Sequence, residues 1–424
     1  MKVLIITYYW PPCGGVGVQR WLRFVRYLPD FGYTPTIITT LNGDYPVKDS
    51  SLELEVSQNA KVLRTKTPTF GNLYKFFSKS KNDKIPYGSL QTNPGDSLFK
   101  KVSTWVRLNL VIPDARIIWN VSAYKAAKKE LKKGGYDAVI TTGPPHSTHL
   151  IGLKLHKQFN LKWIADFRDP WTEMGYLQSV KRLKITKKID RFFENKVVQD
   201  CDQIIAAAHK IISDLNCSAD KVHLIPNGFD PKDFANILKN RKSDEFGLNY
   251  FGSLPQESTP IAVLQALNIL YKDGIRDIKM NFWGNVSNVA KKQLLDLDEF
   301  KIIRFHQHVS HQEAIKLMVN SEMLLLMINN VKNNEGIITA KIFEYLGSGV
   351  KILGVGPEKS EAAQILKLTK SGTMFDYSKY DKIAKYIKSE YMLWKQGEQK
   401  ISTEADMFNC AELTKKLVNV IVKN

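Results

Sequence analysis

The chain has 424 residues, roughly two to three times the length of a usual domain, which predicts two domains. Hydrophobic residues make up 43% of it and charged residues 24%, which excludes a disordered, collagen-like or low-complexity chain. The 61 Lys and Arg outnumber the 42 Asp and Glu, and the net charge of +19 favours an anionic partner: nucleic acid, an anionic bilayer surface or a phosphorylated substrate. Solvated helix faces would produce the same excess.

Short apolar runs alternate with helix-length amphipathic stretches from end to end, a pattern typical of parallel sheets with crossover helices. The predicted strands of the first half are residues 3–7, 36–39, 62–64, 138–141, 163–166, 203–206 and 222–225. A second series covers residues 248–251, 279–283, 302–305, 323–327, 351–354 and 373–375. The sequence therefore predicts an α/β protein with two doubly wound parallel sheets.

The boundary between the two series is marked by turn-rich residues 226–231 and by the polar stretch 239–245, the predicted linker. Helical patterns at residues 380–395 and 405–422 close the chain. Residues 70–109 combine Lys, Ser, Asn and Gly with apolar side chains, as a mobile surface-docking element would. An ordinary loop and helix packed on the first domain is the alternative.

The four cysteines, Cys13, Cys201, Cys217 and Cys410, are too widely spaced for a zinc or disulfide pattern, which suits a reducing compartment. No apolar run approaches the ~18 residues of a membrane span, and Pro11 and Pro12 interrupt the first apolar run too early for a secretion signal. We expect a cytoplasmic protein whose only membrane contact is peripheral, at the inner face of the cytoplasmic membrane.

The loop after the first predicted strand contains Gly14, Gly15 and Gly17 and leads into a helical pattern that carries Arg20. Glycines let the backbone approach a ligand, and a helix start offers free amides to an anion, although any tight strand-to-helix turn uses glycine. A dinucleotide-binding fingerprint would need a third glycine where Arg20 stands. The sequence therefore argues against a dehydrogenase.

Two further loops place polar groups at carboxyl ends of predicted strands. His146 lies in the loop 142–147, and the loop 166–171 contains Asp166, Arg168, Asp169 and Trp171. Ligands bind at this edge of a parallel sheet, so these side chains could hold a sugar hydroxyl or a phosphate. A histidine satisfied by backbone and a local ion pair are the structural alternatives.

In the second half, residues 334–346 follow the apolar strand 323–327 and open a helix. The amides between Gly336 and Thr339 would meet a diphosphate, with the helix dipole favouring its charge. Lys341 and Glu344 are three apart and share a helix face, so the lysine could neutralise phosphate while the glutamate accepts from ribose hydroxyls. A surface ion pair is the alternative.

Taken together, these residues resemble family 4 of the retaining GT-B glycosyltransferases, which bind a nucleotide sugar between two Rossmann-like domains. The similarity rests on four segments in order, residues 11–15, 225–230, 248–254 and 341–346. Residues 144–147 and 166–171 are similar to a bacterial branch that builds envelope polysaccharides such as lipopolysaccharide, O-antigen or capsule.

The resemblance implies metal-independent transfer with retention at the anomeric carbon, and no cofactor besides the nucleotide-diphosphate sugar donor. It implies an acceptor domain at 1–230, a donor domain at 231–400, and a C-terminal helix within 401–424 that crosses back to the first domain. The implied catalytic residues are His146, Asp166 and Asp169. The implied acceptor-binding residues are Gly14, Gly15, Arg20, Arg168 and Trp171, and the acceptor is a glycan or lipid-linked glycan. The implied donor-binding residues are Gly252, Ser253, Glu335, Gly336, Ile337, Ile338, Thr339, Lys341 and Glu344.

Two departures from the family pattern concern the donor site. Residues 252–258 contain neither of the two cations that the family uses for the diphosphate, which leaves Lys341 as the substitute. Eight residues separate Glu335 from Glu344, one more than the family spacing. A nucleotide-sugar epimerase of the same architecture and a degenerate glycan-binding or scaffold subunit remain alternatives. Nucleic acid is not expected, because aromatic residues in the basic region do not repeat at strand spacing.

Overall fold

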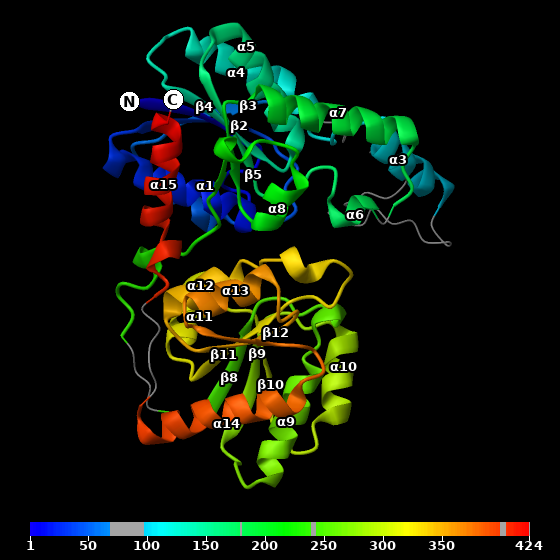
Figure 1. Cartoon of the computed structure of the whole chain (residues 1–424), viewed down its shortest axis with the longest axis vertical. Helices are drawn as coiled ribbons and strands as arrows, with labels where there is room; N and C mark the ends of the chain where they lie inside the picture. Colours follow the sequence, from blue (N-terminus) through cyan, green and yellow to red (C-terminus); the bar gives the residue numbers. More distant parts are fainter. Residues whose placement is uncertain (68–96, 179, 239–242, 399–403, 424) are drawn as a thin grey trace. The chain divides into compact units, whose positions relative to one another are not determined.

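A computed structural model describes residues 1–67, 97–178, 180–238, 243–398 and 404–423. The chain divides into two units, each built on its own sheet (Figure 1). The N-terminal unit comprises Met1–Pro226 with Leu413–Asn424, and the C-terminal unit comprises Asn227–Glu412. Most of the predicted docking segment 70–109 and parts of the predicted linker 239–245 and of the segment 401–424 lie outside the described residues.

The N-terminal unit contains a parallel seven-stranded sheet in the order β3-β2-β1-β4-β5-β6-β7. Its strands are β1 (Lys2–Ile6), β2 (Thr34–Thr40), β3 (Lys61–Thr65), β4 (Ala138–Gly143), β5 (Lys162–Phe167), β6 (Gln203–Ala206) and β7 (Val222–Leu224). The order reverses at β1, between β2 and β4, and ligands of open α/β sheets bind beyond the carboxyl ends of the strands at such a point.

The helices of the N-terminal unit are α1 (Val16–Tyr27), α3 (Leu98–Asn109), α4 (Asn120–Leu131), α5 (His149–Phe159), α6 (Gly175–Gln178), α7 (Lys184–Asp200) and α8 (His209–Asp214). The last helix, α15 (Cys410–Val422), contributes Leu413, Leu417 and Val420 to the core of this unit. In the described part of the chain, no helix combines the length and apolar character that crossing a membrane requires.

The C-terminal unit contains a parallel six-stranded sheet in the order β10-β9-β8-β11-β12-β13. Its strands are β8 (Phe246–Phe251), β9 (Ile278–Trp283), β10 (Ile303–His306), β11 (Met323–Met327), β12 (Ile352–Val355) and β13 (Gly372–Phe375). Its helices are α9 (Ile261–Lys272), α10 (Asn288–Leu297), α11 (His311–Val319), α12 (Lys341–Ser348), α13 (Glu361–Leu368) and α14 (Tyr380–Gln396). Helices α11 to α13 cover one face of the sheet, and α9 and α14 cover the other (Figure 1).

The middle strands β4, β8 and β11 are buried along their whole length, as parallel strands are when helices cover both faces of a sheet. Strand β8 and strand β11, for example, have no solvent-exposed residue. Continuous apolar runs are what such strands require, and every predicted strand coincides with an observed one to within two residues at either end. The predicted α/β class with two Rossmann-like units is therefore confirmed.

Candidate functional site

Asp166, near the end of β5, is the centre of a buried polar network in the N-terminal unit. Its carboxylate accepts hydrogen bonds from Arg20 Nη2 at 2.9 Å, Trp21 Nε1 at 2.7 Å and Thr142 Oγ1 at 2.8 Å. Arg20 also donates to the carbonyl of Pro226 at 2.9 Å. Both charged side chains are shielded from solvent. Asp166 therefore joins α1, β4 and β5, and its oxygens are occupied by protein donors.

Arg168 fastens three chain segments through backbone carbonyls. Its guanidinium donates to the carbonyl oxygens of Gly17 on α1, of Gly143 at the end of β4 and of Pro144 in the loop that follows. A Cβ atom at Gly17 would overlap Nη1 of Arg168, so the absence of a side chain there admits the guanidinium. The arginine predicted for acceptor binding thus fixes the loops that would meet an acceptor.

His146 and His149 follow β4 and lie in an aromatic cluster. The His146 ring stacks on Trp171, with 5.1 Å between centroids, and His149 stacks on Phe167 at 4.7 Å. His146 Nε2 is 3.2 Å from the carbonyl of Pro170, and His149 Nδ1 is 2.9 Å from Thr141 Oγ1.

The other ring nitrogens of the two histidines, His146 Nδ1 and His149 Nε2, are buried and have no hydrogen-bond partner among the described residues. A Cβ atom at Gly143 would lie 2.6 Å from the first and 2.7 Å from the second, so both nitrogens face this glycine. Burial lowers the pKa of His146 well below its usual value and that of His149 to about 3. Both imidazoles are therefore neutral at neutral pH.

The remaining predicted residues of this unit differ in exposure. Asp169 is exposed, whereas Trp171 is buried and donates from Nε1 to Asp190 at 2.8 Å. Gly15 has φ of 99° and precedes α1, with open space where a side chain would be. Gly14 packs against Val47, whose carbonyl accepts its amide hydrogen at 3.0 Å. The structure therefore gathers the loops after β1, β4 and β5, and leaves Gly15 and Asp169 open to solvent.

Two residues that sequence reasoning missed support these loops. Asp114 accepts from the backbone nitrogen and the hydroxyl of Ser147, each at 2.8 Å, and so fixes the turn that carries His146. Asp190 on α7 accepts from Trp171 and from Arg182 Nη2, the latter at 2.7 Å. Asp114 lies 33 residues from Ser147, and Asp190 lies 19 residues from Trp171, so no local spacing marks these contacts.

In the C-terminal unit, Lys341 at the start of α12 lies against the end of β8. Its ammonium is 5.0 Å from the centroid of the Tyr250 ring, and its Cε would be 2.9 Å from a Cβ atom at Gly252. Gly252 has φ of 96°, which favours glycine. No described residue forms an ion pair with Lys341, and burial lowers the pKa of this ammonium. A cation without an ion-pair partner thus lies at the carboxyl edge of the sheet.

Backbone amides near Lys341 are also free to bind a ligand. Within the described residues, no hydrogen bond uses the N–H groups of Ile338, Thr339, Ala340 or Lys341. Four consecutive donors at a helix start form a ready anion site. Ile337 N–H is instead used by Asn334, whose carbonyl accepts it at 3.1 Å.

The two glutamates differ. Glu344 Oε1 is 3.1 Å from His311 Nε2, on the neighbouring helix α11, whereas Glu335 is exposed in the preceding turn. Ser253 is exposed as well, and its carbonyl accepts from the Tyr250 hydroxyl at 2.7 Å. Of the described residues, no three His, Cys, Asp or Glu side chains are placed to hold a metal ion together.

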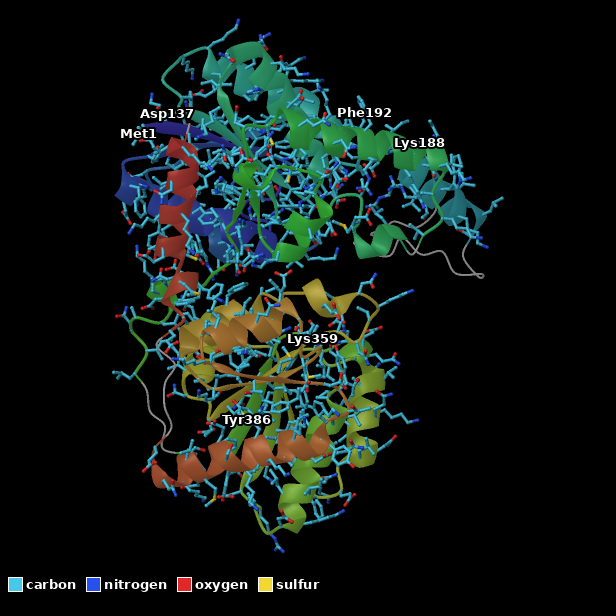
Figure 2. All side chains as sticks on the ribbon, viewed as in Figure 1. Met1, Asp137, Lys188, Phe192, Lys359 and Tyr386 are labelled. Atoms are coloured by element: carbon cyan, nitrogen blue, oxygen red, sulfur yellow. The ribbon has the colours of Figure 1, made fainter. Side chains whose placement is uncertain are left out.

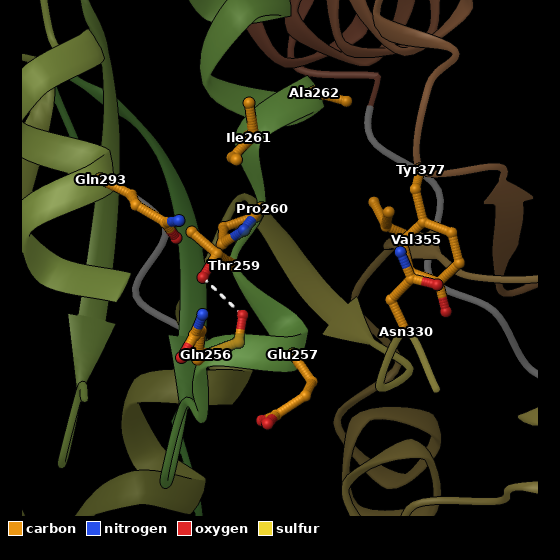
Figure 3. A pocket seen from close by; sticks show the side chains of 10 residues that line it. All are labelled: Gln256, Glu257, Thr259, Pro260, Ile261, Ala262, Gln293, Asn330, Val355 and Tyr377. Atoms are coloured by element: carbon orange, nitrogen blue, oxygen red, sulfur yellow. Dashed lines mark hydrogen bonds between the residues drawn. The ribbon is translucent and has the colours of Figure 1, made fainter. Parts of the chain in front are cut away.

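A pocket of about 450 Å³ opens at the carboxyl edge of the same sheet (Figure 3). Its lining comes from the loop after β8 and the start of α9, and from Gln293, Asn330, Val355 and Tyr377. Asn330 N–H donates to the carbonyl of Glu257 at 2.8 Å, which joins the loops after β8 and β11. The predicted donor residues are not among the side chains that line it.

Comparison with known proteins gives one family match by sequence. Residues 90–233 match the model of a family described as Glycosyltransferase Family 4. This segment contains the loops that carry His146, Asp166, Arg168 and Trp171. No curated protein sequence matches the chain.

Solved structures similar to the chain span its whole length. Sucrose-phosphate synthase from Thermosynechococcus elongatus has a TM-score of 0.63 at 11% identity, covering 99% of this chain and 98% of that chain. The lipopolysaccharide outer core galactosyltransferase WaaB has a TM-score of 0.60 at 12% identity, covering 99% of each chain. A putative UDP-N-acetylglucosamine 2-epimerase from Listeria monocytogenes has a TM-score of 0.55 at 10% identity, with 99% and 95% covered. At these identities the likeness shows the fold, which is the GT-B class.

Proposed function

We propose that the chain is a retaining, metal-independent glycosyltransferase that moves a sugar from a nucleotide-diphosphate sugar to a glycan or lipid-linked acceptor. The biological setting we propose is bacterial cell-envelope polysaccharide synthesis. The family match over residues 90–233 supports the transferase class. The observation that carries the proposal is the ammonium of Lys341, without an ion-pair partner among the described residues, beside four free backbone amides.

A diphosphate suits this part of the C-terminal unit. The amides of residues 338–341 can donate to phosphate oxygens, and the Lys341 ammonium can neutralise phosphate charge at the same place. Glu344 lies one helix turn further, where its carboxylate can accept from ribose hydroxyls. In this proposal, Lys341 neutralises the diphosphate charge in place of the two cations that residues 252–258 lack.

The acceptor, in this proposal, meets the loops of the N-terminal unit. Exposed Asp169 can accept a hydrogen bond from an acceptor hydroxyl, whereas His146 is neutral and its ring nitrogens are buried, so its proposed place is beside the transferred sugar. Asp166 and Arg168 act as positioning residues, because protein donors and acceptors occupy their polar atoms. A retaining transfer in which the leaving phosphate takes the acceptor proton needs no protein base, which fits the occupied carboxylate of Asp166.

The compartment we propose is the cytoplasm, at the inner face of the cytoplasmic membrane. Among the described residues, no disulfide joins Cys13, Cys201, Cys217 or Cys410, as suits a reducing compartment. An acceptor carried on a lipid would require peripheral contact with that membrane.

The proposal is tested first by binding and then by product. The protein is titrated with UDP, ADP, GDP and CDP, and the tightest is used for Lys341→Ala and for Lys359→Ala, an exposed lysine of the same unit. We expect Lys341→Ala to lower the affinity for the nucleoside diphosphate about tenfold, the value of one charge-assisted hydrogen bond. Lys359→Ala should leave this affinity unchanged. Mass spectrometry after incubation with a panel of nucleotide sugars then identifies hydrolysis or transfer.

The two alternatives give different results in the same experiments. An epimerase, which shares this fold, converts a free nucleotide sugar to an isomer with no acceptor present. A glycan-binding or scaffold subunit binds none of the four nucleoside diphosphates, and that outcome would reject the transferase.

A further inference from the structure

Two helices of the N-terminal unit expose apolar stripes at helical spacing. On α3 the stripe is Leu98, Val102 and Trp105, and on α7 it is Ile185, Ile189 and Phe192. Phe192 is 61% and Ile185 60% exposed, although both are large apolar side chains. Residues spaced i, i+4 and i+7 lie on one helix face, so each stripe is a continuous apolar surface. We call the two stripes together the α3–α7 surface.

Most charged residues around these stripes are basic, and the partly exposed acidic residue Glu173 is paired with Arg191. The exposed lysines are Lys181, just before α7, and Lys184, Lys187 and Lys188 at its start, and Lys188 lies one turn from Phe192 (Figure 2). The acidic residues in the middle of α7, Asp190 and Glu194, point inward and are buried. The described part of α3 contains no acidic residue. Apolar side chains flanked by lysines are typical of a helix that lies in the interface of an anionic bilayer.

Hydrogen bonds join the two helices. Asn109, the last residue of α3, accepts two hydrogen bonds at the start of α7: Leu183 N–H, just before the helix, donates to its Oδ1 at 2.7 Å, and Thr186 Oγ1 donates to its carbonyl at 2.9 Å. Arg182 Nε also donates to the carbonyl of Leu108 at 3.2 Å. The end of α3 is thus fixed to the start of α7.

The same joint reaches the candidate acceptor loop. Arg182 forms a buried ion pair with Asp190 at 2.7 Å, and Asp190 accepts from Trp171 at the end of the loop 166–171. Glu194, one turn further along α7, accepts from the backbone N–H and the hydroxyl of Thr172. The helix that carries the lysines therefore also holds the loop proposed to meet the acceptor.

We propose that the α3–α7 surface docks this chain on a bilayer that contains anionic lipid, with the two stripes entering the headgroup region and the lysines contacting lipid phosphates. This inference rests on the proposed function in one respect: a lipid-linked acceptor would then reach the loop 166–171 from the membrane to which α7 is bound. A second copy of the chain is a less suitable occupant, because two such surfaces would bring lysines of like charge together.

Flotation with vesicles tests the surface. The full chain is mixed with vesicles of phosphatidylcholine alone or with an equal amount of phosphatidylglycerol, at low and at high salt. We expect the wild-type chain to float with the anionic vesicles at low salt, and less at high salt, because salt screens the lysines. A wild-type chain that stays at the bottom with anionic vesicles at low salt would overturn the proposal.

Matched variants locate the contact. Ile185→Ser with Phe192→Ser removes the two most exposed side chains of the α7 stripe, and Val289→Ser with Leu295→Ser removes two exposed apolar side chains from α10 as a control. Lys184→Glu with Lys188→Glu reverses the charge, and Lys382→Glu with Lys385→Glu on α14 is its control. We expect both α7 variants to lose about tenfold in vesicle partitioning and both controls to keep it. Equal flotation of test and control variants contradicts the assignment, as does a change of oligomeric state without a change in flotation.

Nucleoside diphosphate binding without vesicles separates this inference from the proposed function. The α7 variants should retain that binding, which also shows that they fold, while Lys341→Ala should lose it and still float. Wild-type chain that binds the nucleotide but no anionic vesicle overturns only the docking surface. Wild-type chain that floats but binds no nucleotide overturns only the transferase.

Discussion

Arg20 and Asp166 form a buried ion pair, with 2.9 Å between Arg20 Nη2 and Asp166 Oδ1. Removing one charge of such a pair leaves the other uncompensated, at a cost of about 3 to 5 kcal/mol. We therefore expect Asp166→Asn to destabilise the N-terminal unit by this amount, and Asp169→Asn, at an exposed carboxylate, to change stability by less than about 0.5 kcal/mol. Tryptophan fluorescence during urea unfolding reports this, because most tryptophans of the chain lie in that unit. Equal urea-unfolding midpoints for the two variants would show that the buried Asp166 carboxylate does not stabilise the N-terminal unit.

Lys341 predicts a pH dependence of nucleoside diphosphate binding. Burial lowers the pKa of its ammonium, so the charge is lost at a lower pH than for an ordinary lysine. Since the protonated form binds the phosphate, affinity should fall as pH rises through the lowered pKa. Arginine stays charged throughout, and Lys341→Arg should give a flatter profile. Calorimetric titration across the alkaline range checks this, and parallel profiles for the two proteins would contradict it.

Glu344 should act on the ribose. Glu344→Ala should weaken nucleoside diphosphate binding by about tenfold, the value of one or two hydrogen bonds, but should not weaken binding of the 2′,3′-dideoxy analogue. A double-mutant cycle that combines the protein change with the ligand change measures this coupling. Additive losses would place the ribose elsewhere and leave Glu344 as the partner of His311.

The fold could be predicted because its signal is local. Strand β11 is a continuous apolar run, and the predicted strand 203–206 has the same bounds as β6 (Gln203–Ala206). The support of the candidate site could not be predicted in the same way, because Asp114 reaches Ser147 across 33 residues and Arg20 reaches Asp166 across 146. The motifs marked the loops, but only the folded chain shows that Asp166 and Arg168 use their polar atoms to fasten them.

His149 predicts acid sensitivity of the N-terminal unit. Its pKa of about 3 in the folded chain lies below the value of about 6.5 in an unfolded chain, so its stabilising contribution is complete above pH ~6.5 and is lost as pH falls toward 3. His149→Asn should reduce that loss by about 1.4 kcal/mol per pH unit in this window. His308→Asn, at an exposed histidine of the other unit, is the control. The test is to measure the free energy of unfolding at several acidic pH values. If its slope against pH is the same in His149→Asn as in the wild-type chain, His149 is not the source of the acid sensitivity.

Gly17 and Arg168 should depend on each other. Because a Cβ atom at position 17 would overlap Nη1 of Arg168, Gly17→Ala should displace the guanidinium from the carbonyls that it holds, at a cost of about 1 to 3 kcal/mol for the acceptors left unpaired. The physical reason is specific, so the cost should vanish in an Arg168→Ala background, where no guanidinium remains to be displaced. A double-mutant cycle from urea unfolding measures this coupling. If Gly17→Ala costs the same in both backgrounds, the loss comes from the α1 backbone itself, and Arg168 does not fasten the loops after β1 and β4 in the way described.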